Sequence, residues 1–344
     1  MSFTLIKQLP TPEEVKAATP LSPALQKMKQ ERDAEIAAVF TGKSDKFLVI
    51  IGPCSADNEP AVLDYVSRLA KVQEKVKERL ILIPRIYTNK PRTTGIGYKG
   101  IMLQPDPQGK PDIEAGILTV RSMHLKAMEE SGLTAADEML YPDNWPYVDD
   151  FLSYVAIGAR SVEDQKHRLA TSGFDVPAGM KNPTSGDLSV MLNSIIAAQH
   201  GHEFDYRGAE YRTDGNPLAH AILRGATNKH GNSIHNYHFE DLQLLLQKYS
   251  ETTLANPACI VDTNHSNSNK KYDQQPRIAR EVMNSRRYDS NIHGLVNGLM
   301  IESYLVPGCQ KIGPNQTYGQ SITDPCLGWE ESERLIMELA ELAD

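Results

Sequence analysis

The sequence predicts an α/β protein, a closed (β/α)8 TIM barrel, and three observations lead to this fold. Short apolar runs alternate with longer amphipathic runs from near residue 47 to the end of the chain. The apolar runs are nearly continuous, which is typical of parallel strands covered on both faces. Eight such units can be counted, the number that closes a barrel. An open, doubly wound sheet is the alternative, because a strand count from one sequence can err by one or two.

Residues 1–46 precede this alternation and are predicted to form an N-terminal extension, with the barrel over 47–344. Within the extension, residues 22–40 (SPALQKMKQERDAEIAAVF) follow an amphipathic helical pattern after a proline-rich lead. The length of 344 residues fits one large barrel with such additions.

From residue 47 onward, strands and helices are expected to alternate. The strands are expected at 47–53, 80–86, 135–140, 154–159, 177–182, 219–225, 259–265 and 296–303. The helices between and after them are expected at about 59–78, 113–131, 145–152, 161–172, 187–199, 238–250, 275–287 and 328–343. Ser161 and Asp187 stand where a helix needs acceptors for its free backbone N–H groups, so each is expected to begin a helix.

An additional segment before the sixth strand is expected to form a hairpin. Residues 202–218 (HEFDYRGAEYRTDGNPL) alternate aromatic and polar side chains and contain an Asp-Gly-Asn turn sequence. Together with the N-terminal helix, this hairpin predicts association into a homo-oligomer, either a dimer or a tetramer.

Composition and charge exclude several classes of protein. Four cysteines, at positions 54, 259, 309 and 326, show no paired CxxC spacing, which predicts a reducing, cytoplasmic location rather than a disulfide framework or a zinc ribbon. No apolar run approaches the ~20 residues that span a bilayer, so no membrane association is expected. The net charge of −8 argues against nucleic-acid binding through a broadly basic surface.

Cations follow the expected strands at the point where each strand ends. In a barrel these ends form one working face. A single lysine or arginine there is more often a surface ion, but six on one rim of an acidic protein repel one another unless anions fill the site. The sequence therefore predicts a ligand with several phosphate or carboxylate groups. The six are Arg85, Lys90, Arg92, Arg160, Lys181 and Arg224.

A second set of strand ends carries side chains that bind metals. Taken singly, Cys54 is more often a buried strand cysteine, and His265 could cap a loop beside Asn264 and Asn267. Their joint placement predicts a mixed site for a divalent metal ion, Mn, Fe, Co or Zn. The ligands are expected to be Cys54, His265, Glu302 and Asp324.

A series of short motifs in order along the chain resembles the 3-deoxy-D-arabino-heptulosonate-7-phosphate (DAHP) synthase family, in its feedback-regulated enteric form. The motifs are GPCS (52–55), KPRTT (90–94), GAR (158–160), KN (181–182), ILRG (222–225), DTNHSNS (262–268), MIES (300–303) and SITDPCLGWE (321–330). The resemblance implies condensation of phosphoenolpyruvate with erythrose 4-phosphate and water, with release of phosphate. This reaction is the first step of the shikimate pathway to the aromatic amino acids.

The resemblance also implies a role for each site residue. Arg160, Lys181 and Arg224 would hold the phosphoenolpyruvate phosphate. Arg85 and Lys90 would lie near its carboxylate, and Arg92 with Thr93 would bind the sugar phosphate. Lys90, Glu138 and His265 would form the catalytic set, with Glu138 beside the reacting water. The family's metal ligands match Cys54, His265, Glu302 and Asp324, as the pattern predicted.

Other functions remain alternatives. The related enzyme that condenses phosphoenolpyruvate with arabinose 5-phosphate, KDO 8-phosphate synthase, has a KANRSS-like loop, whereas KPRTT at 90–94 favours the four-carbon sugar. A metal-dependent phosphosugar aldolase would use three histidines, and only His265 is suitably placed. A non-catalytic phosphosugar-sensing barrel should have lost a metal ligand or a catalytic base. This chain retains all of them: Cys54, Lys90, Glu138, His265, Glu302 and Asp324. The family's aromatic amino acid effector binds near 171–177 and the hairpin, where this chain differs in residue type, so the resemblance does not identify an effector.

Overall fold

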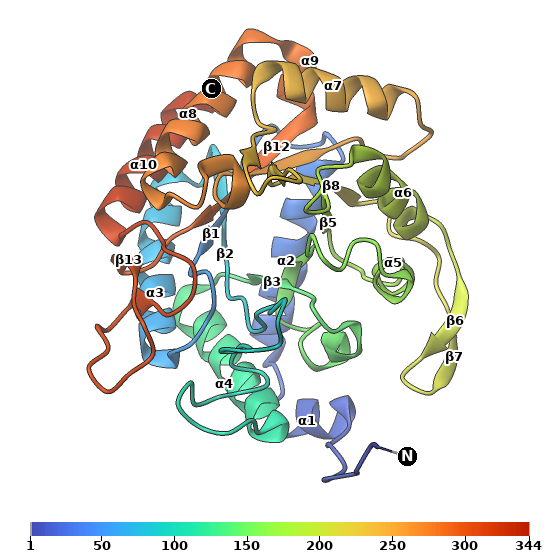
Figure 1. Cartoon of the computed structure of the whole chain (residues 1–344), viewed down its shortest axis with the longest axis vertical. Helices are drawn as coiled ribbons and strands as arrows, with labels where there is room; N and C mark the ends of the chain where they lie inside the picture. Colours follow the sequence, from blue (N-terminus) through green and yellow to red (C-terminus); the bar gives the residue numbers. More distant parts are fainter. Residues whose placement is uncertain (1, 344) are drawn as a thin grey trace.

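The computed structural model describes residues 2–343, and in this part of the chain eight parallel strands form one sheet. The strand order is β2-β1-β12-β11-β8-β5-β4-β3. A bridge between Arg85 and Ala136 joins the two end strands, and the Ile86 N–H donates to the Ala136 carbonyl at 3.0 Å. The sheet therefore curls into a ring with helices outside it (Figure 1), which confirms the (β/α)8 barrel and excludes the open sheet.

All eight expected strands are present. Nearly every residue in them is buried, as expected for a sheet covered on both faces. Their bounds are β1 (Phe47–Gly52), β2 (Leu80–Pro84), β3 (Ala135–Glu138), β4 (Leu152–Ile157), β5 (Ala178–Lys181), β8 (Ala219–Leu223), β11 (Cys259–Asp262) and β12 (Val296–Glu302).

The outer helices agree with the sequence in most places. They are α3 (Glu59–Val76), α4 (Ile113–Ser131), α5 (Gln165–Thr171), α6 (Leu188–Gln199), α7 (Phe239–Ser250), α8 (Gln275–Tyr288), α9 (Ser290–Leu295) and α10 (Trp329–Leu342). Asp187 caps α6 as expected, accepting from the Ser189 N–H at 2.8 Å. The short helix α9 was not predicted.

Two helix predictions are wrong in detail. The helix expected at 145–152 is instead a 3₁₀ turn, η1 (Pro142–Tyr147): the turn already begins at Pro142, and in an α-helix from there Pro146 would lack the N–H that bonds to the Pro142 carbonyl. Helix α5 begins after Asp164 rather than Ser161, since the Asp164 carboxylate accepts from the His167 N–H at 3.2 Å.

The N-terminal extension contains α1 (Pro12–Ala18) and α2 (Pro23–Phe40), and the second matches the helix expected at 22–40. Ile36, Val39 and Phe40 of α2 are buried in one cluster with inward-facing residues of the barrel strands. The Phe40 ring stacks on the His220 ring, with centroids 4.2 Å apart. Helix α2 thus crosses behind the ring of strands and fills its amino end (Figure 1), which leaves the carboxyl end for the site.

The inserted hairpin is present and projects from the barrel (Figure 1). Strands β6 (Glu203–Tyr206) and β7 (Ala209–Arg212) pair antiparallel. The turn lies at Arg207 and Gly208, with φ of 55° and 77°, and not at the expected Asp-Gly-Asn sequence. Two further small pairs, β9 (Ala226–Thr227) with β10 (Ser233–Ile234) and β13 (Val306–Cys309) with β14 (Gln320–Ser321), were not predicted.

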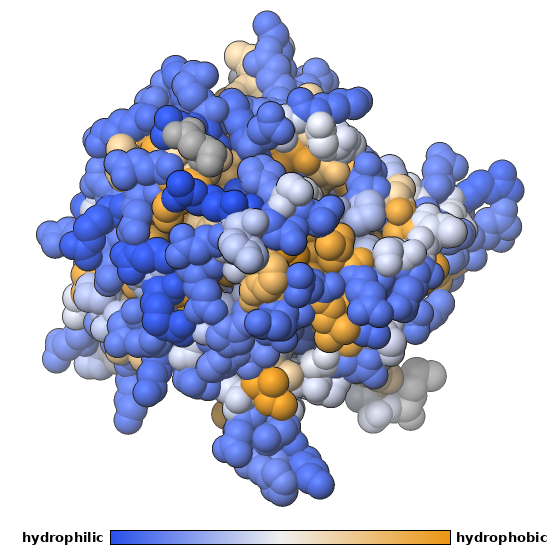
Figure 2. Space-filling model, turned by 90° about the horizontal axis from the view of Figure 1, so that it is seen from above, coloured by the Kyte–Doolittle hydropathy of each residue, from blue (hydrophilic) through white to orange (hydrophobic). Residues whose placement is uncertain are grey.

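The face of the molecule seen in Figure 2 is largely polar, with hydrophobic residues in scattered groups. Across residues 2–343, no helix combines the length and the apolar character needed to cross a bilayer.

Candidate active site

A cavity of about 550 Å³ opens at the carboxyl ends of the barrel strands, and all six predicted cations line it. Arg85, Lys90 and Arg92 follow β2, while Arg160 follows β4. Lys181 ends β5, and Arg224 follows β8. Four strand ends therefore bring their cations to one place. Thr93, Glu138, His265, Cys54 and Asp324 also line the cavity.

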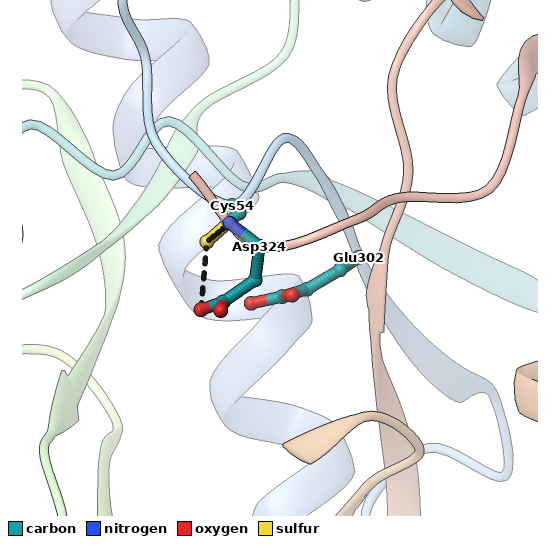
Figure 3. A group of neighbouring side chains, drawn as sticks. All are labelled: Cys54, Glu302 and Asp324. Carbon is teal, nitrogen blue, oxygen red and sulfur yellow. Dashed lines mark hydrogen bonds between the residues drawn. The ribbon is translucent and has the colours of Figure 1, made fainter. Parts of the chain in front are cut away.

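Three of the four predicted metal ligands gather beside this cavity. Cys54 follows β1, Glu302 ends β12, and Asp324 follows β14. One ligand atom from each lies within 4.8 Å of the other two, and among the described residues this group has the composition and spacing to hold a metal ion. Figure 3 shows the two carboxylates next to each other. The Cys54 thiol donates to Asp324 Oδ2 at 3.4 Å.

The fourth predicted ligand, His265, lies next to this group but outside it. Its Nε2 is 3.9 Å from Glu302 Oε1, and its Nδ1 is 2.8 Å from Asp262 Oδ2. The Asp262–His265 contact lacks hydrogen-bond geometry, and both atoms are without a hydrogen-bond partner among residues 2–343, while Nε2 lies on the side of Glu302.

The donor set fits a divalent transition-metal ion. One sulfur, two carboxylates and a neighbouring imidazole match the mixed ligand sets of such ions. Burial, followed by the charge of Glu302, raises the pKa of the Cys54 thiol to about 11. A nearby cation is therefore required to stabilise the thiolate that binds metals.

The Lys90 ammonium provides positive charge at this group. It lies 2.7 Å from Cys54 Sγ and 2.8 Å from Asp324 Oδ2. Burial alone would lower the pKa of Lys90, but Cys54 and Asp324 raise it above its ordinary value. Burial likewise favours a protonated Asp324, and the charge of Lys90 outweighs this and lowers the Asp324 pKa. Both groups are therefore charged at neutral pH.

Arg85 is as deeply buried as Lys181, with 2% of its surface exposed. Its Nη2 donates to Glu302 Oε1 at 2.8 Å, and its guanidinium lies 3.7 Å from the centre of the Tyr87 ring. Within residues 2–343, its buried Nη1 has no hydrogen-bond partner. A buried donor without a partner in a cavity wall is well suited to a ligand oxygen.

Lys181 lies between two carboxylates, 3.6 Å from Glu138 Oε2 and 3.4 Å from Asp262 Oδ2. Burial alone would raise the pKa of Glu138, but Lys181 and then Arg85 outweigh it and lower the pKa. Glu138 is therefore an ionised carboxylate, as a general base must be.

The loop after β2 carries three of the functional residues. The Lys90 N–H donates to the Lys99 carbonyl at 2.9 Å, and Arg92 Nε donates to the Tyr98 carbonyl at 2.8 Å. A Cβ on Gly100 would lie 2.3 Å from the Thr88 carbonyl, and its φ is 99°. Only glycine fits this closely packed position, which folds the loop back on itself.

The sequence did not point to several residues that line the cavity. Lys270 places its Nζ 3.7 Å from Asp324 Oδ1. It lies in a segment with left-handed backbone, in which His265, Asn269 and Lys270 have φ of 50°, 54° and 59°. The run of Asn, Ser and Lys after His265 was the available signal for such a turn. Hydroxyl groups also line the cavity, from Thr184, Thr227, Ser233 and Ser266.

Comparison with known proteins finds one family model and many named relatives. The model described as the DAHP synthetase I family matches residues 22–337. The Trp-sensitive phospho-2-dehydro-3-deoxyheptonate aldolase of Enterobacter agglomerans is 37% identical over 343 residues, which cover 98% of this chain and 95% of the relative. A Tyr-sensitive enzyme of the same name from Salmonella typhimurium is 37% identical over 339 residues, with 96% and 92% covered.

A solved structure has the same fold over its full length. The phospho-2-dehydro-3-deoxyheptonate aldolase of Francisella tularensis SCHU S4 superimposes with a TM-score of 0.91 and 30% sequence identity. The match covers 99% of this chain and 98% of that one.

Proposed function

We propose, from the premise that the chain belongs to the DAHP synthetase I family, that its cavity condenses phosphoenolpyruvate with erythrose 4-phosphate and water. The products are 3-deoxy-D-arabino-heptulosonate 7-phosphate and phosphate, and the reaction opens the shikimate pathway. The observation that carries the proposal is the convergence of six cations on one cavity beside a Cys, Glu and Asp group. Two phosphates and one carboxylate provide the negative charge that such a rim needs.

The six cations divide between the two substrates. Arg160, Lys181 and Arg224 would hold the phosphoenolpyruvate phosphate. The unpartnered Nη1 of Arg85 supports a bond to the carboxylate, with Lys90 beside it. Arg92 and Thr93 would bind the sugar phosphate at the cavity mouth, where the side chain of Thr93 is exposed.

Cys54, Glu302 and Asp324, together with His265, would hold a divalent metal ion such as Mn, Fe, Co or Zn. When bound, such an ion supplies Lewis acidity that polarises the aldehyde oxygen of the sugar phosphate. Asp262, whose Oδ2 lies 2.8 Å from His265 Nδ1, would attract the ring electrostatically and could accept from Nδ1 after a small rotation. The site does not select among these metals by ligand type alone.

Lys90 and Glu138 would perform the water step. Attack of the enol carbon on the aldehyde leaves C2 of phosphoenolpyruvate electron-poor, and this carbon must capture water before phosphate leaves. The ionised Glu138 carboxylate can take the proton from that water at Oε1 or Oε2. Lys90 would orient the water and the substrate carboxylate. A general base of this kind contributes typically ~10²- to 10⁴-fold.

An aromatic amino acid is the effector that we propose. A second cavity, of about 460 Å³, is lined by both strands of the hairpin and by residues 172–175 of the 171–177 stretch. Its walls include Trp145, Phe174, Phe204, Tyr206 and Tyr211. Two of the relatives are named Trp-sensitive and Tyr-sensitive.

We also propose a homo-oligomer, dimer or tetramer, formed through the extension and hairpin, in the reducing cytoplasm. All four cysteines are free, which supports a reducing location.

Phosphate release from phosphoenolpyruvate tests the function directly. We expect release with erythrose 4-phosphate, little with arabinose 5-phosphate, and loss of activity on chelation. Adding Phe, Tyr or Trp one at a time identifies the effector. Equal or greater turnover of arabinose 5-phosphate would contradict the substrate assignment, and no turnover of either sugar with any of the four metals would contradict the activity.

A further inference from the structure

The carboxylate of Asp137 is buried without a counter-ion. Asp137 lies on β3 directly before Glu138, and 2% of its surface is exposed. Its Oδ1 accepts from the Thr88 N–H at 2.9 Å and from the Glu138 N–H at 2.7 Å. Its Oδ2 accepts from the Thr88 hydroxyl. Within residues 2–343, no lysine, arginine or histidine forms an ion pair with Asp137.

A buried carboxylate is costly unless its neighbours compensate for the lost water. Burial raises the pKa of Asp137 to about 7, even though the hydrogen bonds from Thr88 lower it. A neutral side chain would cost less free energy to bury at this position. The three donors instead require acceptors on both oxygens, and a carboxylate supplies them.

Thr88 lies where the loop that carries Lys90, Arg92 and Thr93 leaves the barrel. It is fully buried, four residues after the end of β2 and two residues before Lys90. Its carbonyl accepts from the Met102 N–H at 3.1 Å, so the outgoing and returning parts of the loop meet here. Asp137 therefore holds the base of the loop that carries Lys90, Arg92 and Thr93.

Asp137 and Glu138 point to opposite faces of the sheet, because successive strand residues alternate. Glu138 lines the cavity, whereas Asp137 does not. Asp137 thus lies behind the site and does not contact the substrates.

We propose that Asp137 is a positioning residue, which fixes the loop carrying Lys90 against the strand carrying Glu138 through its bonds to Thr88. The catalytic importance of this anchor rests on the proposed function, in which Lys90 and Glu138 act on the same water. The anchor itself is a structural statement that does not depend on the reaction.

Asp137→Asn tests the proposal with little change in volume. It replaces the oxygen that accepts from the Thr88 hydroxyl with an NH2 group, so the hydroxyl must turn to accept from that group, and a charge-assisted bond becomes a weaker neutral one. We expect kcat to fall about tenfold or more, because a displacement near 1 Å can cost ~10²-fold in rate, while the KM for phosphoenolpyruvate, assigned mainly to Arg160, Lys181 and Arg224 outside this loop, stays within about threefold. Thr88→Val should give the same pattern, and Thr88→Ser, which keeps the hydroxyl, should restore most of the rate.

Hydrogen exchange of the peptide covering 88–104 provides a readout apart from activity. Asp137→Asn and Thr88→Val should speed exchange in this peptide and leave the exchange rates of the barrel strands unchanged. Thr134→Val is a matched control, since Thr134 is buried beside the start of β3 and its hydroxyl has no partner among the described residues. This variant should change neither kcat nor the exchange of 88–104.

The outcomes separate the two proposals. A wild-type protein without activity, but with faster 88–104 exchange in Asp137→Asn, would overturn the function and leave the anchor standing. An active wild type with unchanged kcat and exchange in both Asp137→Asn and Thr88→Val would overturn the anchor. If Asp137→Asn does not fold, Thr88→Val and Thr88→Ser decide the question by the same two measurements.

Discussion

Lys90 is the one of the six cavity cations that contacts both Cys54 and Asp324 of the predicted metal site. Its ammonium contacts Cys54 Sγ at 2.7 Å and Asp324 Oδ2 at 2.8 Å, so it provides the positive charge that these ligands need. If Cys54, Glu302 and Asp324 hold a divalent ion, that ion would take over the compensating charge, and the Lys90 ammonium would be available for a substrate carboxylate, as proposed above. One side chain thus serves two neighbouring sites.

Cys54→Ala should remove bound metal and activity together, because it deletes the soft ligand of the group. Metal content after dialysis, measured by atomic emission beside the rate of phosphate release, checks this. Cys259→Ala is the matched control, since Cys259 is a buried strand cysteine that does not line the cavity. Full metal content and turnover in Cys54→Ala would refute the ligand role.

At the residue level, the sequence located side chains that follow strand ends but not those that depend on loop geometry. Arg85 and Lys181 could be placed because parallel strands end on one face. Lys270 reaches Asp324 only through a left-handed turn. Asp137 had no signal in its own neighbourhood, because its partner Thr88 is 49 residues away.

At the level of elements, the pattern of apolar runs predicted every barrel strand because each is buried on both faces. It failed where local chemistry decides the structure. Pro146 converts an expected helix into a 3₁₀ turn, and Asp164 instead of Ser161 begins α5. Strands of two residues, such as β9 and β10, are too short to show the alternation of apolar and polar side chains from which strands are predicted.

Helix α2 is the element that completes the interior of the barrel, and its packing leads to a prediction. Phe40 is 4% exposed and stacks on His220 inside the ring. Phe40→Ala should lower the free energy of unfolding by about 3–5 kcal/mol, since it leaves a cavity among strand side chains. Urea denaturation measures the change.

Gln30→Ala, at an exposed position of the same helix, is the control for Phe40→Ala and should stay within about 0.5 kcal/mol of the wild type. A loss at Phe40 no larger than that at Gln30 would mean that α2 does not support the barrel interior.

For the molecule as a whole, charge is arranged unevenly. The chain carries a net charge of −8, yet its cavity gathers at least six cations. Such a cavity concentrates anionic substrates against the sign of the rest of the surface, and the attraction weakens with ionic strength.

Buried histidines make the stability of the whole protein sensitive to acid. Burial lowers the pKa of His124 and of His220 from 6.5 to about 4. The unfolded chain therefore binds more protons than the folded one between these pH values. The stabilisation is complete above pH 6.5 and is lost as the pH falls toward 4, by up to about 3 kcal/mol for each histidine.

Urea midpoints measured from pH 7.5 to pH 4 check this expectation. His220→Gln keeps an acceptor for the Tyr154 hydroxyl, which lies 2.8 Å from His220 Nε2, but it cannot be protonated in this range. The variant should lose stability less steeply than the wild type as the pH falls. An unchanged slope would show that His220 does not contribute.

The order of strands around the ring has a consequence for synthesis on the ribosome. Strand β1 pairs with β2 on one side and with β12 on the other, and β12 also pairs with β11. As the polypeptide emerges, one edge of β1 stays unpaired until residues 296–302 are synthesised, nearly 250 residues later. Unpaired strand edges can form hydrogen bonds with strands of other chains. A nascent chain that stalls before this point keeps an unpaired strand edge, so we expect it to aggregate more readily than the completed barrel.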